Sequence, residues 1–146
     1  MGTGADEVFV GSSEHNLDAK GRLVLPAKFR EELGARAYLT FSTDDVLQLW
    51  TDAEFHRRMK ALQPDLDADE EQMRRFRRLS ANSSDVEVEP SQGRIAIPAR
   101  LRDLANLKVG QRVVISGVYT AIELWNPKDF ERRVLMIDET PGGAPA

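Results

Sequence analysis

The sequence contains no cysteine and only two histidines, His15 and His56. The lack of cysteine excludes a disulfide framework, thiolate catalysis and a cysteine-ligated zinc or iron–sulfur site, and two histidines are too few for a histidine-rich metal centre. Long apolar runs are also lacking, so no segment is expected to span a membrane. The first ten residues do not have the basic-then-apolar layout of a signal peptide. We therefore expect a cytoplasmic protein that needs no cofactor or metal.

The 146 residues suffice for one ordinary domain or two very small ones, and 41% apolar with 30% charged residues is a globular composition. The net charge of −4 argues mildly against a nucleic-acid partner, whose binding proteins usually carry a basic surface. The charges are unevenly placed, however. Residues 20–30 and 91–102 contain basic side chains and no acid. A block of like charge is more often a solvated face than a binding site, so these two islands alone decide nothing.

The two basic islands belong to an internal repeat. Residues 17–31 align with residues 89–103 at a shift of 72, with the glycine, the arginine after it, the proline, the following alanine and the last arginine identical. Farther along the chain the shift is 75, and the only two tryptophans, Trp50 and Trp125, become equivalent. The sequence is thus a two-fold repeat with a three-residue insertion in its second copy.

Both copies predict the same order of elements: a short strand, a polar turn around Gly21 or Gly93, a second short strand, a short helix that begins at a proline, two more strands and a second helix. The expected strands lie at 8–10, 22–25, 37–41 and 46–50 in the first copy, and at 86–88, 94–97, 113–115 and 121–125 in the second. Each copy alone is too small to bury a comfortable core. We therefore expect the copies to pack about a pseudo-two-fold axis, with both tryptophans buried.

The second helix of each copy follows the tryptophan and carries apolar residues at i, i+4 and i+7, which predicts one buried face. These residues are Phe55, Met59 and Leu62 in the first copy and Phe130, Val134 and Ile137 in the second. Residues 65–79 are expected to form a connecting helix, with acids first and Arg74, Arg75, Arg77 and Arg78 after them. A solvated helix face is the favoured interpretation of these arginines, ahead of phosphate binding. The tail 140–146 is expected to be disordered.

The sequence is poor in catalytic groups. It shows no nucleophile paired with a histidine and no glycine-rich phosphate loop, and His15 is interpreted as a turn histidine bonded to backbone. The repeated Gly-Arg turn is different, because Arg22 and Arg94 each directly follow a glycine in a tight turn. A planar guanidinium held on such a frame suits guanine edges or phosphates. The alternative is an ion pair inside the turn between Asp18 and Arg22, and the two can hold together.

The segment Asn16–Arg30, its degenerate second copy and the Glu123-Leu124-Trp125 strand end resemble the MraZ family, bacterial transcriptional regulators made of two tandem SpoVT-AbrB modules. The resemblance covers roughly residues 8–134. It implies an α+β, mainly β fold in which two AbrB-like modules form a swapped-hairpin-like β-barrel with short flanking helices. The implied division is module 1 at 8–56, a connecting helical segment at 57–83, module 2 at 84–130, and a helix end with a disordered tail at 131–146.

The resemblance also implies a function. It predicts double-stranded DNA as the partner, in the form of direct repeats upstream of the division and cell-wall gene cluster, control of that operon, association with the nucleoid and assembly into a ring-shaped homo-oligomer. No enzyme activity, small-molecule substrate or membrane partner is expected. The expected DNA-contacting residues are Lys20, Arg22 and Arg94, followed by Lys28 and Arg30, on turns formed by Asp18, Gly21 and Gly93.

The second copy departs from the motif, because Pro90 and Gln92 stand where the first copy has Asp18 and Lys20. The acid of the motif is therefore expected to be lost there, which weights DNA contact toward the first copy. The rival function is a ring-forming structural or protein-interaction module without DNA specificity.

Overall fold

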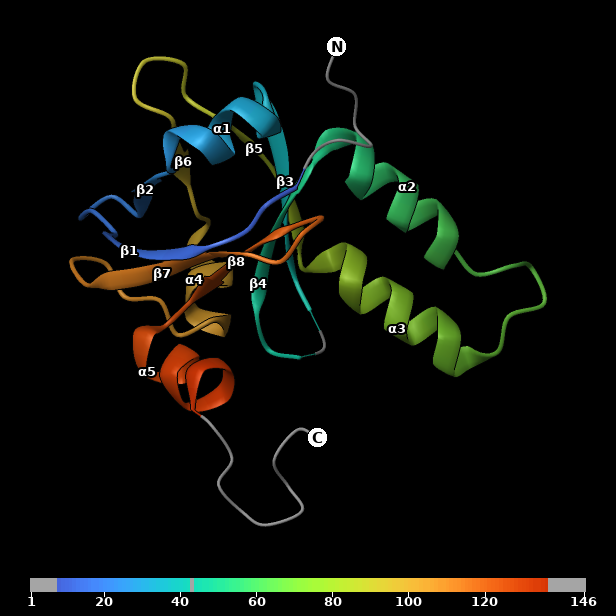
Figure 1. The fold of residues 1–146 in the computed structure, drawn as a ribbon. Helices are drawn as coiled ribbons and strands as arrows, with labels where there is room; N and C mark the ends of the chain where they lie inside the picture. Colours follow the sequence, from blue (N-terminus) through green and yellow to red (C-terminus); the bar gives the residue numbers. More distant parts are fainter. Residues whose placement is uncertain (1–7, 43, 137–146) are drawn as a thin grey trace, which may run out of the picture.

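The computed structural model describes residues 8–42 and 44–136. Its strands form a six-stranded antiparallel sheet with the order β1-β7-β8-β4-β3-β5 and a separate two-stranded ribbon, β2-β6 (Figure 1). The strands are β1 (Ser12–Asn16), β2 (Arg22–Val24), β3 (Arg36–Phe41), β4 (Leu47–Thr51), β5 (Ser83–Glu87), β6 (Arg94–Ala96), β7 (Arg112–Gly117) and β8 (Ile122–Trp125).

Short helices flank the strands. They are α1 (Ala27–Leu33), α2 (Asp52–Leu62), α3 (Glu70–Ala81), α4 (Ala99–Leu104), α5 (Pro127–Phe130) and a π-helical turn, η2 (Glu131–Leu135). Helices α2 and α3 lie side by side and project from the sheet, while α5 and η2 lie at its other end (Figure 1). The predicted class, α+β and mainly β, is confirmed. None of the helices in the described part of the chain is long and apolar enough to cross a membrane.

The fold has internal two-fold symmetry. The order of the six-stranded sheet is unchanged when each strand of the first copy is exchanged for its equivalent in the second. Leu23 pairs with its equivalent Ile95 at the centre of the ribbon, and Gln48 pairs with its equivalent Glu123 at the centre of the sheet. A pseudo-two-fold axis therefore passes through these two pairs, as the repeat predicts.

The two copies exchange their edge strands. Strand β1 of the first copy pairs with β7 of the second, and β5 of the second pairs with β3 of the first. The ribbon continues from these edges, because Leu17 bridges Leu23 and the amide of Glu89 donates to the carbonyl of Arg94 at 2.9 Å. The hydrogen-bonded sheet itself is open, with β1 and β5 as its edges, and does not close into the barrel that the resemblance implies.

One shared core holds the copies together. Leu23 and Ile95 of the ribbon are both at most 1% exposed, and each such aliphatic side chain contributes about 1.5–3 kcal/mol on burial. Trp50 and Trp125 are 5% and 7% exposed. Both rings also carry an arginine guanidinium on one face, Arg58 at 5.0 Å and Arg133 at 4.9 Å. The predicted burial of the tryptophans in equivalent settings is confirmed.

Several boundaries and one packing prediction are wrong. A strand forms at Ser12–Asn16 instead of residues 8–10, where within the described part only Phe9 makes a bridge, to Tyr119. The connecting helix starts at Glu70 because Asp69 caps it with a reciprocal Gln72 capping box. The tail 140–146 lies outside the described residues.

The expected buried face of the second helices is wrong for α2. Its apolar side chains are half-buried or exposed, with Leu62 46% exposed, although Tyr38 of β3 stacks on Phe55 at 4.1 Å. In the second copy Phe130 is buried and Val134 is 49% exposed, and Ile137 lies outside the described residues. Periodicity predicted an amphipathic helix, but it could not say whether the chain itself covers the apolar side.

Candidate nucleic-acid interface

The first Gly-Arg turn closes tightly around Asp18. The amide of Gly21 donates to the Asp18 carbonyl at 3.0 Å, and the amide of Asp18 donates to the Arg22 carbonyl at 3.0 Å. Gly21 has φ +77°, a left-handed conformation that side chains with a Cβ adopt only at a cost. The glycine in the motif is therefore a requirement of the turn, and it places Arg22 at the start of β2.

The Asp18 carboxylate fixes this turn from inside. It accepts the backbone amides of Lys20 and Arg22, both at 2.9 Å, and the Arg22 Nε at 3.0 Å. The Arg22 amide and then the side-chain bond hold the pKa of Asp18 below its ordinary value, against a smaller opposing effect of desolvation. Arg22 remains about one-third exposed at its side chain. The turn thus presents an oriented guanidinium whose charge is not buried.

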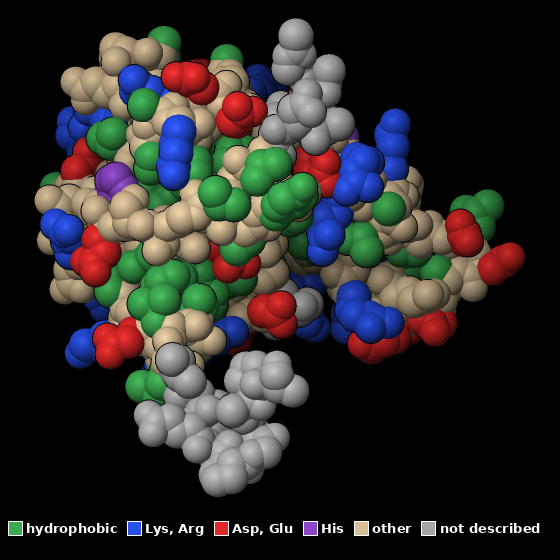
Figure 2. Space-filling view, in the orientation of Figure 1, with side chains coloured by type: hydrophobic (Ala, Val, Ile, Leu, Met, Phe, Trp, Pro, Cys, Tyr) green, Lys and Arg blue, Asp and Glu red, His purple; other side chains and the backbone are tan. Residues whose placement is uncertain are grey.

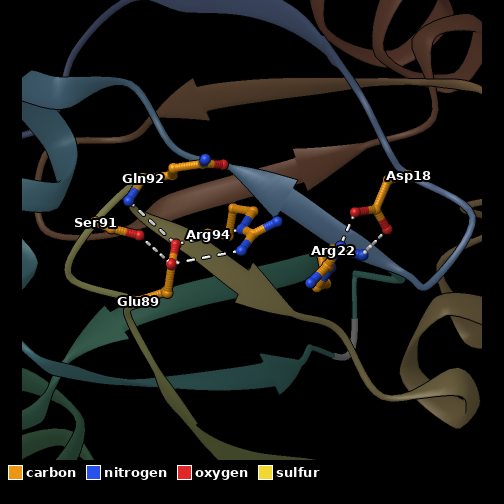
Figure 3. A network of polar contacts seen from close by, with 6 residues as sticks. All are labelled: Asp18, Arg22, Glu89, Ser91, Gln92 and Arg94. Atoms are coloured by element: carbon orange, nitrogen blue, oxygen red, sulfur yellow. Dashed lines mark hydrogen bonds and ion pairs between the residues drawn. The ribbon is translucent and has the colours of Figure 1, made fainter.

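The second turn keeps an acid, which corrects the expectation that Pro90 removes it. Glu89 occupies the place of Asp18, because its amide donates to the Arg94 carbonyl at 2.9 Å and its carbonyl accepts the Gly93 amide at 2.8 Å. Its carboxylate accepts the Arg94 Nε at 3.3 Å and Nη2 at 3.4 Å (Figure 3). The second turn is one residue longer, and an ungapped alignment on the Gly-Arg pair conceals the extra residue.

Other donors also converge on Glu89. Its carboxylate accepts the hydroxyl of Ser91 and, at 3.1 Å, the amide of Gln92. The Ser91 bond and the Arg94 bond lower the pKa of Glu89 from 4.5 to about 2. Glu89 is therefore ionised at neutral pH. Both turns share one design, an ionised carboxylate that holds an arginine against a glycine turn.

The ribbon brings the two arginines onto one surface. Leu23 and Ile95 point into the core, and residues alternate faces along a strand, so Arg22 and Arg94 share the outer face. Their carboxylate partners lie at opposite ends of the ribbon (Figure 3). The glycines tie the turns together, because the Gly93 carbonyl accepts the Leu25 amide at 3.0 Å. The symmetric bond, from Ile97 to Gly21, is 2.9 Å long.

Each turn also receives an arginine from the helix of the other copy. A Cβ built on Gly21 would lie 2.0 Å from Nη1 of Arg102, and one built on Gly93 would lie 2.3 Å from Cδ of Arg30. Arg102 is anchored there by a 2.6 Å bond from Nη1 to the Ile97 carbonyl. Arg30 was a predicted DNA contact. Arg102 was not, although the repeat makes it the equivalent of Arg30.

Two other predicted residues lie at different places. Lys20 is exposed on the first turn next to Arg22. Lys28, on α1, is engaged with the start of the described chain, where its Nζ donates to the Val10 carbonyl at 3.3 Å and lies 5.2 Å from the Phe29 ring centroid. The predicted set therefore divides into residues at the two turns and a lysine outside them. Glu89 and Arg102 are the turn residues that sequence reasoning missed.

The remaining chemistry of the described residues is sparse. They contain no group of three or more His, Asp or Glu side chains that could hold a metal ion. His15 lies in β1 rather than in a turn, and its ring bonds to the hydroxyl of Ser13 at 2.8 Å instead of to backbone. Burial first, and then Arg112, lower its pKa.

Comparison with known proteins identifies the family. The model of the family described as "MraZ protein, putative antitoxin-like" matches residues 8–78 and 86–140, most of both copies. The chain belongs to the MraZ family. Among its relatives, the Transcriptional regulator MraZ of Desulforamulus reducens is 37% identical over 128 residues, 86% of each chain. That of Caldicellulosiruptor saccharolyticus is 39% identical over 136 residues, which are 91% of this chain and 90% of the relative.

Proposed function

We propose that this chain is a transcriptional regulator that binds specific sequences of double-stranded DNA through the outer face of the β2–β6 ribbon. The observation that carries the proposal is the pair of carboxylate-held arginines, Arg22 and Arg94, on that face. An arginine restrained by an acid loses little conformational freedom when it binds, and its remaining N–H groups suit a guanine edge or a phosphate. The names of the relatives, transcriptional regulators, support this function.

The charge distribution supports DNA as the partner in spite of the net charge of −4. Lys20 and Arg22 stand together on the first turn, and Arg30 and Arg102 rest on the two turn glycines. Basic side chains thus surround the ribbon, whereas the acids Asp18 and Glu89 are already engaged with arginines. Phosphate contacts from such a cluster position a protein on the duplex, and base contacts then supply specificity.

We further propose that the chain acts as a ring-shaped homo-oligomer. Its target is a set of direct repeats upstream of the division and cell-wall gene cluster, where it controls its own operon in association with the nucleoid. Exposed apolar surface supports self-association. The apolar residues of α2 and α3 line an open groove, and η2 and its end expose Val134, Leu135 and Met136 at 49%, 60% and 66%. In the view of Figure 2, apolar side chains gather over the region of α5 and η2.

A structural or protein-interaction module remains the second candidate, and the same apolar groove favours it. Such surfaces mark protein contacts whether or not DNA is bound. The arginines of α3 do not favour a phosphate site over this candidate, because Arg74 and Arg75 pair with Glu71 at 2.8 and 4.0 Å on a solvated helix face. The two functions therefore differ in one respect, sequence-dependent binding of DNA.

Fluorescence anisotropy with DNA distinguishes the two functions. The full chain would be titrated into labelled DNA from the region upstream of its own gene and into a duplex of the same composition in scrambled order, at two salt concentrations. A regulator binds the upstream DNA more tightly at both, and its affinity falls steeply as salt rises. A protein-interaction module shows no preference between the duplexes, and that result would refute the proposed function.

A further inference from the structure

The two turns differ in length but hold their arginines in the same way. Asp18 and Arg22 are four positions apart, whereas Glu89 and Arg94 are five apart, with Pro90 inside the longer turn. In both turns the amide of the acid donates to the carbonyl of the arginine, at 3.0 and 2.9 Å. The extra backbone residue therefore leaves the register of the hairpin intact.

The longer side chain of glutamate compensates for the longer turn. Glu89 has one more methylene group than Asp18, and its carboxylate reaches both the Nε and the Nη2 of Arg94. It also accepts the Ser91 hydroxyl and the Gln92 amide, just as Asp18 accepts the Lys20 amide. A sequence motif that demands an acid four residues before the arginine misses this arrangement.

We infer that Glu89 is the positioning residue of a second DNA-contacting arginine, Arg94, so that each chain presents two matched arginine contacts on one ribbon. The inference rests on the proposed DNA-binding function. Among the described residues, the Nη1 atom of neither Arg22 nor Arg94 has a hydrogen-bond partner, so each guanidinium still offers N–H groups to a ligand. The second copy then contributes to the recognition of sequence.

A positioning role and a purely electrostatic role predict opposite signs for the loss of Glu89. Removing a carboxylate near a DNA-binding face strengthens nonspecific binding, since phosphates are then repelled less. If Glu89 orients Arg94, the same change must weaken binding to the specific site. Glu89→Gln, measured against upstream and scrambled duplexes, separates the two effects.

The expected result is about a tenfold loss of affinity for the upstream DNA, at the lower end of the cost of a lost base contact, with unchanged or stronger binding to the scrambled duplex. Glu87→Gln is the matched control. It removes the same charge two residues away, where the exposed carboxylate has no polar partner among the described residues. It should affect both duplexes alike. Thermal unfolding of each variant checks that the fold is retained.

A change of turn length tests the register directly. Glu89→Asp alone should weaken specific binding, because the shorter carboxylate does not reach Arg94 across the longer turn. Combining Glu89→Asp with deletion of Pro90 recreates the four-residue spacing of the first turn and should restore affinity to within about threefold. A role in stability alone would not predict this recovery of sequence preference.

The inference is overturned if Glu89→Gln behaves like Glu87→Gln on both duplexes, or if the shortened turn fails to restore preference in a folded protein. Failure of the proposed function gives a different result, in which the unmodified protein already lacks preference for its upstream DNA.

Discussion

Gln48 and Glu123 occupy equivalent positions of the two copies and hydrogen-bond to each other across the pseudo-two-fold axis, with 3.0 Å between Nε2 and Oε2. An exact repeat would place two identical side chains here. The chain instead pairs an amide donor with a carboxylate acceptor. The other oxygen of Glu123 accepts the indole N–H of Trp125 at 3.0 Å, whereas the indole of Trp50 donates to Thr40 at 3.1 Å. The two halves are therefore matched in shape and distinct in polarity.

Glu123→Ala should lower the free energy of unfolding by about 1–3 kcal/mol, because it leaves the Trp125 indole and the Gln48 amide without their acceptor in a largely buried setting. Urea unfolding followed by tryptophan fluorescence measures the change. Glu14→Ala is the control. It breaks a pair with Arg112 in which both side chains are about half exposed, and it should change stability by less than about 0.5 kcal/mol.

Arg22→Ala should abolish specific DNA binding and leave the fold intact. The lost contact is worth about 1–3 kcal/mol at each turn, and several subunits on one DNA multiply the effect. The Asp18–Arg22 pair is at the surface and contributes little to stability, so the unfolding midpoint should stay nearly constant. Anisotropy and circular dichroism provide the two measurements. Unfolding or dissociation of the variant would instead show that this ion pair serves the structure.

The two positive-φ glycines Gly21 and Gly110 offer a matched comparison. Alanine at either position should cost about 1 kcal/mol, because φ is +77° and +80°. Only at Gly21 does the new Cβ collide with a neighbour, the guanidinium of Arg102, whereas nothing lies within 4 Å at Gly110. Urea unfolding should report similar losses of stability for both variants. DNA binding should fall for Gly21→Ala alone, and equal losses of binding would separate Arg102 from the interface.

The pH dependence of stability should reveal the Glu89 carboxylate. Its pKa is about 2 in the folded protein, against an ordinary value of 4.5. Because the folded pKa is the lower one, the stabilising contribution is complete above pH 4.5 and is lost as the pH falls toward 2. Glu89→Gln should therefore flatten the fall in thermal midpoint across this window. An unchanged acid profile would mean that the Ser91 and Arg94 bonds do not hold the charge.

The repeat made much of the fold predictable. Identity at the glycine, arginine and proline of the two islands fixed equivalent turns, strands and short helices, and the matched tryptophans indicated a shared core. The length of the second turn was not predictable in this way. The Gly93-Arg94 identity anchors an alignment that assigns Pro90 to the acid, and only the backbone bonds of Glu89 show where the extra residue lies.

Contacts between the copies were the other gap. Arg30 and Arg102 align in the sequence, but local pattern cannot show that each crosses to the glycine of the opposite turn. The exposure of α2 has the same origin. Its spacing of Phe55, Met59 and Leu62 correctly indicates an amphipathic helix, whereas burial depends on what packs against it.

The number of DNA repeats should control affinity. One turn offers few phosphate contacts, and about three contacts give a salt slope of only about −3, typical of weak association. Several subunits on one DNA raise the effective concentration of each further contact. Head-to-tail subunits repeat the same ribbon in the same direction, so direct repeats about 10 base pairs, or ~34 Å, apart present equal faces of the duplex.

Binding should therefore fall steeply when the number of repeats in a duplex of constant length drops from three to one. Shifting their spacing by half a helical turn should have a similar effect, because the second site then lies on the opposite face of the DNA. A closed ring engages more than a few sites only if it opens or the DNA bends, which costs several kcal/mol. Anisotropy titrations with one, two and three boxes measure this dependence. Equal affinity for one box and for three correctly spaced boxes would contradict the multivalent mechanism and leave a single ribbon as the whole binding unit.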